Sequence, residues 1–239
     1  MIYRVNELRD NITMQEHDSS MIIFSLTDNE DNAAIVGADN GGAYAIKVSK
    51  SVHSDWKLAV GDFIGYCTAN NINAVLEMSQ TDYDTAMQHY SGHSFNERVL
   101  RTYEPQILIH STTMESWNHI QRDGMLKSWN RLRSEQAITE KHPIGIQLGD
   151  PASFSDYIMF GGGVTGEIVV NSKQSGAIIM DVNTQYLTGA RLYLDAKKIA
   201  QDGLLVRDGC HTKVKDALPL EPYLIWAATW DKIGLPSQV

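Results

Sequence analysis

The sequence predicts an α+β protein in which a smaller β-rich unit, residues 1–80, precedes a larger unit, residues 81–239. Two observations lead to this prediction. Residues 21–73 hold short apolar runs separated by stretches rich in Asp, Asn and Gly, which is typical of consecutive strands and turns. After Pro105, strand-like and helix-like runs follow one another without the regular βαβ alternation of a parallel α/β protein.

Four strands are expected in the first unit. They lie in the runs MIIFSL, AAIVGA, AYAIKV and DFIGYC. The turn-forming stretches TDNEDN and ADNGG separate the first three runs. Ser79 followed by Asp82 is a helix-start signal, so we expect a helix over residues 82–90, near the seam between the two units.

The second unit is expected to begin with a short strand, QILIH at residues 106–110, and a helix. Thr113 is the expected N-cap, because its hydroxyl can accept a hydrogen bond from a free N–H group of the first turn. The helix is expected to run over residues 114–122, to bury Trp117, and to end at Gly124, a residue type common just after helices.

Short strands and one more helix are expected further along the chain. The run IGIQL is expected to form a strand, and Pro151 to begin a short helix over residues 151–160. Three glycines at 161–163 then form a loop. The remaining strands are expected in EIVVN, GAIIMDV, ARLYL, GLLVR and the closing run LEPYLIWAAT.

Composition argues against several classes of protein. The 239 residues carry a formal net charge of −9, which argues against a broad, non-specific grip on nucleic acid. The two cysteines, Cys67 and Cys210, form no CxxC pair, so no structural metal is expected. No apolar run approaches the roughly 20 residues that cross a membrane, and the first residues lack the pattern of a secretory signal. We therefore expect a soluble, cytoplasmic protein.

Several short motifs, taken in order, carry a resemblance to a known family. They are SGHS at 91–94, LIHST at 108–112, IQRDGM at 120–125, IIMDV at 178–182, DGLL at 202–205 and LPLEPYL at 218–224. This order resembles that of the RNA 2'-phosphotransferases, which carry a QGHS turn, an LYHGT strand end, an I…GL helix, an L-x-I-D-A strand and a VPPxYL ending. That family uses NAD and belongs to the wider ADP-ribosyltransferase fold.

The resemblance implies a split β-core that holds NAD, and it implies roles for residues of the first motifs. His110, at the end of the first core strand, would lie against the nicotinamide ribose, and Ser111 and Thr112 would add hydroxyl and backbone contacts. His93, in the Gly-His-Ser turn, would contribute to the same site. The implied reaction is attack of an RNA 2'-phosphate on C1 of the nicotinamide ribose, which depends mainly on positioning and electrostatics.

A second likeness supplies three more candidate residues. GIQLGD at 145–150, followed by SFSDY at 153–157, is similar to the segment GIYFAD … S-x-x-Y of protein ADP-ribosyltransferases. It implies that Gln147 belongs to the NAD site and that Tyr157 stacks on nicotinamide. These transferases often need a glutamate for the ribose hydroxyl, and Glu167, in the run EIVV, is the candidate because a carboxylate forms a strong charge-assisted hydrogen bond.

The chain departs from the 2'-phosphotransferase pattern in its cations. Gln88 stands where the family has an arginine four residues before the Gly of the GHS turn, and no Arg-His dipeptide occurs. Lys173 is the only cation in the stretch 164–175. Arg131, in the polar stretch after residue 124, is the candidate to reach a pyrophosphate, since the guanidinium fork matches phosphate oxygens.

Three functions therefore stay open. The first is an NAD-dependent transferase that acts on phosphorylated RNA, and the second is an ADP-ribosyltransferase that acts on protein or nucleic acid. The third is a non-catalytic relative that binds a nucleotide. Cations near His110 would favour the first function. A carboxylate of Glu167 or Glu135 within reach of the ribose would favour the second function, and a site filled by side chains would favour the third.

Overall fold

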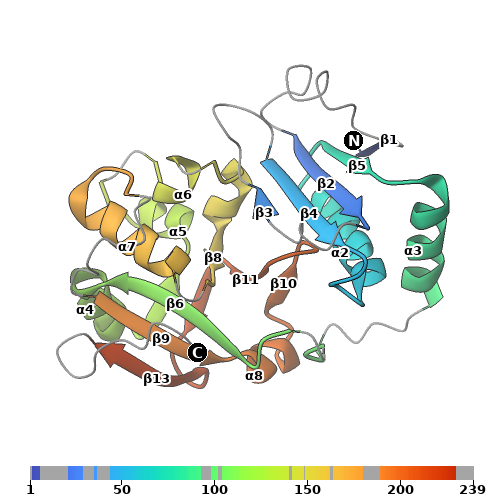
Figure 1. The fold of residues 1–239 in the computed structure, drawn as a ribbon. Coiled ribbons are helices and arrows are strands. Elements are labelled where there is room, and N and C mark those ends of the chain that lie inside the picture. The colour runs from blue at the N-terminus through green and yellow to red at the C-terminus, as the bar shows by residue number, and fades with distance from the viewer. Residues whose placement is uncertain are drawn as a thin grey trace. The chain divides into compact units, whose positions relative to one another are not determined.

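Two compact units can be distinguished in the computed structural model (Figure 1). The structure describes residues 2–5, 21–28, 35–36, 44–92, 98–101, 104–139, 142–147, 149–161, 164–179 and 189–229. The first unit consists of Met1–Phe95, Leu148–Ser153 and Arg207–His211, and the second of Asn96–Gln147, Phe154–Val206 and Thr212–Val239. The first unit thus extends past residue 80 and includes two segments from later in the chain.

A five-stranded sheet with the order β1-β5-β2-β4-β3 forms the centre of the first unit. Its strands are β1 (Ile2–Val5), β2 (Ile22–Thr27), β3 (Ile35–Val36), β4 (Tyr44–Ser49) and β5 (Ala74–Glu77). β1, β5, β2 and β4 run parallel, and only β3 is antiparallel to its neighbour. The aligned residues Ile23, Ala45 and Val75 form a buried apolar row on one face. The runs MIIFSL and AYAIKV are therefore strands, as predicted.

The prediction of a strand in DFIGYC is wrong, because this run lies within the helix α2 (Trp56–Ala69). The buried residues Ala59, Phe63 and Tyr66 recur at spacings of three and four, which is the period of a helix. The six-residue window was too short to reveal that period. Phe63 packs on Phe24 of β2, with ring centroids 5.1 Å apart. This unit therefore combines a mainly parallel sheet with helices and is not purely β-rich.

The helix expected over residues 82–90 is confirmed as α3 (Gln80–Gly92). The backbone N–H of Asp82 donates to Ser79 Oγ at 3.1 Å, which is the predicted capping interaction. α3 packs closely on α2, since a Cβ built on Gly61 would lie 1.9 Å from the ring of Tyr90.

The second unit contains three small sheets. A three-stranded antiparallel sheet has the order β13-β9-β6, a second sheet the order β10-β11-β8, and a two-stranded sheet the order β12-β7. Their strands are β6 (Ile107–Thr113), β7 (Met125–Lys127), β8 (Tyr157–Met159), β9 (Gly189–Asp195), β10 (Leu205–Arg207), β11 (Thr212–Lys215), β12 (Ala217–Pro219) and β13 (Leu224–Thr229). These helices accompany them: α4 (Met114–Asp123), α5 (Trp129–Ser134), α6 (Ile144–Gln147), the 3-10 helix η2 (Ala152–Asp156), α7 (Val164–Ser175) and α8 (Ala196–Gln201).

The strand and helix predicted after Pro105 are both confirmed. Residues 107–110 of QILIH lie in β6, and α4 follows this strand directly. β6 continues to Thr113, so the prediction that His110 ends the strand is wrong: His110 lies in the middle of it. Thr113 Oγ1 accepts from the N–H of Ser116 at 3.1 Å, and Gly124 ends the helix with φ = 64°, a left-handed conformation that glycine adopts without steric cost. Buried Trp117 belongs to the core of this unit.

Two predicted strands of the second unit are wrong in type, and one predicted helix is confirmed only over its first residues. EIVVN lies within α7, and residues 144–147 of IGIQL form the short helix α6. The expected helix over residues 151–160 is the 3-10 helix η2 followed by β8. β-branched residues favour strands only when a pleated surface is available, and here Gly166 and Val170, four residues apart, are two of the buried positions of a helix.

The run GAIIMDV is not a strand over residues 176–179, and its remaining residues lie outside the described part of the chain. ARLYL, GLLVR and LIWAAT lie in or overlap β9, β10 and β13, as predicted. The main core of the second unit is formed by apolar residues of the strands β6 to β12 and of α4 and α8, among them Leu108, Trp117, Leu126, Ile158, Leu192, Leu194, Ile199, Val214 and Leu218. Mixed α and β structure is therefore confirmed for the protein.

Replacing Gly61 by Ala is expected to lower the free energy of unfolding by about 1–3 kcal/mol, because the new methyl group overlaps the Tyr90 ring. Gly65→Ala is the matched control in the same helix. Gly65 is exposed, and its Cβ would meet no atom closer than 3.9 Å, so the substitution should stabilise α2 by roughly 1 kcal/mol. Urea denaturation of the two variants measures both effects, and equal shifts would contradict the close α2–α3 packing.

Candidate functional site

The strand β6 presents its two faces to different parts of the second unit. β6 pairs with β9 over seven residues, which places Leu108 opposite Leu194 and Ser111 opposite Arg191. Side chains alternate between the faces of a strand. Leu108, His110 and Thr112 therefore face the main core, whereas Ile109 and Ser111 face α7.

His110 is partly buried at the point where β6 meets the segment that follows β8. Its Nδ1 lies 3.1 Å from the carbonyl oxygen of Met159, and its ring meets Phe160 edge-on, with centroids 6.4 Å apart. One residue away, the N–H of Gly161 donates to Ile109 O at 2.9 Å. β6 and β8 belong to different sheets, so His110 stands at the junction between them.

The surroundings of His110 keep its imidazole neutral. Burial lowers the pKa of His110 from its ordinary value; the hydrogen bond to Met159 opposes this shift, and the positive charge of Lys173 adds to it. A carbonyl oxygen only accepts hydrogen bonds, so the proton of the neutral ring is on Nδ1. Nε2 is then an acceptor, and no residue in the described part of the chain donates to it.

Lys173 belongs to a polar group at the start of α4. Its Nζ donates to Ser116 Oγ at 3.1 Å, and the same oxygen accepts from Thr113 Oγ1 at 3.0 Å. Lys173 projects from α7, which packs on β6. The group brings one ammonium charge close enough to His110 to lower its pKa.

Ser111 and Thr112, the two neighbours of His110, occupy opposite faces of β6. Thr112 is buried on the same face as His110. Ser111 Oγ is packed against Gly166 of α7, is inaccessible to solvent, and has no hydrogen-bond partner among the described residues. The structure therefore does not bring the Ser111 hydroxyl next to the imidazole.

The other candidate residues lie away from His110 or are engaged elsewhere. Tyr157 lies in β8 instead of a helix, and its buried ring faces Lys213, whose Nζ is 4.9 Å from the ring centroid. Gln147 is exposed at the end of α6. Glu167 lies within α7, not at the start of a strand. His93 lies outside the described residues.

Arg131 and Glu135 are held together in an ion-pair network. Arg131 Nε contacts Glu135 Oε1 at 2.5 Å, and its Nη1 lies 3.4 Å from Asp216 Oδ2. Lys127 contacts the second oxygen of Glu135 at 2.7 Å. These pairs lower the pKa of Glu135, first through the hydrogen bond from Lys127 and then through that from Arg131. Both side chains already have charged partners here.

Three buried cations, Arg207, Lys213 and Arg191, were not predicted from the sequence, and Arg191 is the one next to β6. It lies in the central strand β9, opposite Ser111, and is only 1% exposed. Arginine is rarely buried to this extent unless it is paired. The alternation of charged and apolar residues in ARLYL was the available clue, since it places Arg191 and Tyr193 on the face opposite the main core.

A second polar cluster belongs to the first unit. Buried Asp208 accepts hydrogen bonds from the N–H groups of Cys210 and His211 at 3.1 and 2.7 Å, and the ring of His211 lies 3.1 Å from its other oxygen. Burial raises the pKa of nearby Tyr44 far above its ordinary value, and the charges of Asp150 and Asp208 raise it further. The cluster fixes the turn at residues 207–211 and includes none of the predicted NAD residues.

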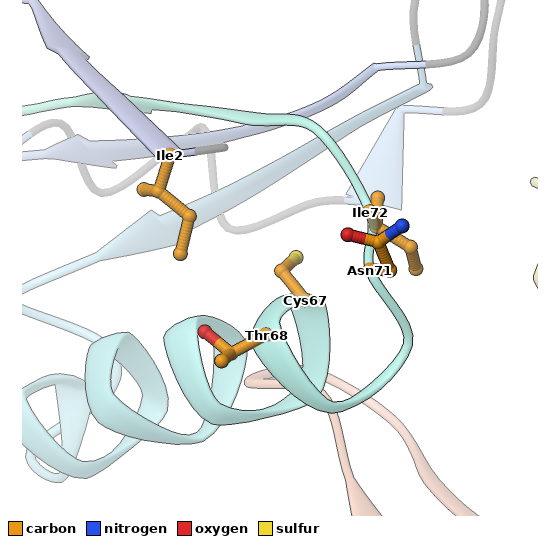
Figure 2. A pocket seen from close by; sticks show the side chains of 5 residues that line it. All are labelled: Ile2, Cys67, Thr68, Asn71 and Ile72. Carbon is orange, nitrogen blue, oxygen red and sulfur yellow. The ribbon is translucent and has the colours of Figure 1, made fainter.

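The first unit also contains a small cavity of about 300 Å³. It lies between the start of β1 and the last turn of α2 and is lined by Ile2, Cys67, Thr68, Asn71 and Ile72 (Figure 2). This volume is at the lower limit of ligand pockets. None of the predicted site residues lines the cavity, so it is separate from the candidate site at His110.

Comparison of the chain with models of protein families, with curated proteins and with solved structures finds no match. Among the residues that the structure describes, no group of three or more His, Cys, Asp or Glu side chains is arranged to hold a metal ion. Within the same residues, none of the helices has the length and apolar character needed to cross a membrane.

His110 is expected to make the protein less stable in acid. Its pKa is lower in the folded than in the unfolded chain, so the unfolded chain binds more protons just below pH 6.5. Above pH 6.5 His110 makes its full contribution to the free energy of unfolding. This contribution is lost as the pH falls from 6.5 through the pKa of the folded state, and the free energy of unfolding then changes by at most about 1.4 kcal/mol per pH unit.

Urea denaturation between pH 7.5 and 5 measures this loss. His110→Gln, which keeps a donor for Met159 O but does not titrate, should show a shallower dependence on pH than the unmodified protein. His119→Gln is the matched control, because His119 is exposed on α4 of the same unit. Identical pH profiles for the unmodified protein and His110→Gln would show that His110 is not held neutral by the fold.

Proposed function

We propose that the protein is an NAD-dependent transferase that resembles the RNA 2'-phosphotransferases. In this proposal it transfers a 2'-phosphate of RNA to NAD through an ADP-ribosylated intermediate. The observation that carries the proposal is the state of His110: a neutral ring, fixed by Met159 O, whose Nε2 is an acceptor without a described protein donor. The motif order that surrounds His110 supplies the identity of the ligand.

A ribose is a suitable partner for such a ring, because its hydroxyl groups donate the hydrogen bond that Nε2 requires. Nε2 is not one of the buried atoms that lack a hydrogen-bond partner, so it is accessible and could accept a hydrogen bond from a hydroxyl of a ligand. The lowered pKa keeps the acceptor available at neutral pH, whereas protonation would remove it. The junction between β6 and β8 also agrees with the split β-core that the resemblance implies.

The phosphate chemistry depends on cations, and the proposal uses Lys173, which lies close enough to His110 to lower its pKa. Arg191, in the strand next to β6, projects from the opposite face of the sheet and has no part in the proposal. The 2'-phosphate oxygen would form a bond to C1 of the nicotinamide ribose while nicotinamide leaves with the electron pair of the C–N bond. Positive charges near such an anionic nucleophile act mainly by positioning it.

A second candidate is an ADP-ribosyltransferase that modifies protein or nucleic acid. The pairing of Arg131 with Glu135 and Asp216 favours it, because it removes one cation that a phosphorylated substrate would need. Glu167 is the remaining carboxylate candidate. It follows Gly166, whose Cα lies against Ser111, so its backbone is next to β6.

The test is mass spectrometry of NAD incubated with the protein, alone and with an oligoribonucleotide that carries one internal 2'-phosphate. Loss of that phosphate with formation of a cyclic-phosphate ADP-ribose is expected. His110→Ala should lower the rate at least tenfold, since one hydrogen bond to the ribose is lost, whereas His119→Gln should leave it unchanged.

Two other outcomes decide between the alternatives. Release of nicotinamide without dephosphorylation would replace the proposed reaction by the second candidate. Unchanged NAD in both incubations would contradict both reactions and leave a non-catalytic nucleotide-binding protein.

A further inference from the structure

An aromatic side chain is exposed on the edge of the sheet that carries His110. Trp226 lies in β13, the edge strand of the order β13-β9-β6, and is 42% exposed. Its neighbour Ile225 is 57% exposed, at an irregularity in the pairing with β9. β13 carries no charged residue that would keep other chains from this edge.

Trp226 is held in place by a stacked neighbour. Its ring lies on that of Tyr193, directly opposite in β9, with centroids 5.0 Å apart and planes inclined by 23°. Tyr193 is only 4% exposed, and its ring covers one face of the indole. Its hydroxyl group is buried without a hydrogen-bond partner among the described residues. The exposed area of Trp226 is therefore a flat surface that is already oriented before a ligand binds.

Two lysines lie at the end of the sheet where β13 begins. Lys197 and Lys198 are exposed in the first turn of α8, which follows β9 directly. Lys198 Nζ lies 3.3 Å from Pro222 O, and Tyr223 donates to Asp202 at 2.7 Å, so the start of β13 is fixed next to α8 (Figure 1). In the described part of the chain, neither lysine forms an ion pair with a carboxylate.

We propose that Trp226, Lys197 and Lys198 form a binding surface for single-stranded nucleic acid. A base stacks on the indole, and the two ammonium groups contact phosphates of the backbone. Single-strand binding elsewhere combines an aromatic platform with positive charge in this way. The patch of Trp226 and Ile225 is far smaller than the roughly 800 Å² that each partner contributes to a stable protein interface, which favours a base over a protein.

The surface is close to the candidate site but separate from it. Trp226 and Ile109 lie in the same row of the sheet, two strands apart, which corresponds to about 10 Å. Trp226 and His110 project from opposite faces. The inference rests on the proposed function and extends it by assigning a surface, outside the candidate site, that holds the single strand. Binding without NAD tests it, so its failure can be distinguished from failure of the proposed reaction.

The experiment is fluorescence anisotropy of a labelled, unphosphorylated 12-residue oligoribonucleotide with the full chain at 50 and 200 mM salt. Trp226→Leu, which keeps an apolar side chain without an aromatic face, should weaken binding about tenfold or more, whereas Trp226→Phe should keep most of the affinity. Replacing Lys197 and Lys198 together by Ala should also weaken binding and lower the salt dependence, because two phosphate contacts are lost. Trp129→Ala is the control, since Trp129 faces Arg133 at 5.2 Å on α5.

Several results would overturn the inference. They are absence of binding at 50 mM salt, equal affinity of Trp226→Leu and Trp226→Phe, and displacement of the oligonucleotide by AMP, which would assign the indole to a free nucleotide. Light scattering provides a further test. If Trp226→Leu converts a dimer to a monomer, this edge is an interface between copies of the chain, and the inference is wrong. Lys197→Ala alone keeps the contact of Lys198 with Pro222 O and decides the question if the tryptophan variants do not fold.

Discussion

The seven-residue pairing of β6 with β9 determines the arrangement of the candidate site. This pairing places His110 on the face of the main core, where the carbonyl of Met159 accepts a hydrogen bond from its Nδ1–H. It places Ser111 on the face covered by α7. A shift of the register by one residue would exchange these faces. It would expose Leu108 and place the imidazole under the helix. The buried row of Leu108, Leu192 and Leu194 makes such a shift unfavourable, so apolar packing fixes the position of the titratable ring.

Local signals in the sequence predicted part of the fold well. β6, α4 and its two caps were predicted because a capping hydroxyl and a left-handed glycine act within a few residues of themselves. α2 and α7 were missed because β-branched and aromatic residues dominate short windows of both helices. Their helical state depends on contacts distant in sequence, such as Gly166 against Ser111 and Phe63 against Phe24. Tertiary packing of this kind overrides local propensity.

His110 stays a predicted site residue, and its surroundings could not be predicted from the sequence. The motif order identified His110 as the residue to examine, and the structure supplies its partner Met159 and the nearby charge of Lys173. Spacing along the chain gave no means of knowing that Ser111 would face away from the imidazole or that Arg131 would pair with Glu135. Such pairings depend on which strands become neighbours.

The central claim is that the fold keeps His110 neutral and presents its Nε2 to a ligand hydroxyl. Nuclear magnetic resonance of the imidazole nitrogens, recorded against pH with and without NAD, tests this most directly. We expect a neutral ring protonated on Nδ1, a pKa below 6.5, and a change of the Nε2 resonance when NAD is added. A ring protonated on Nε2 at neutral pH, or an Nε2 resonance unaffected by saturating NAD, would contradict it.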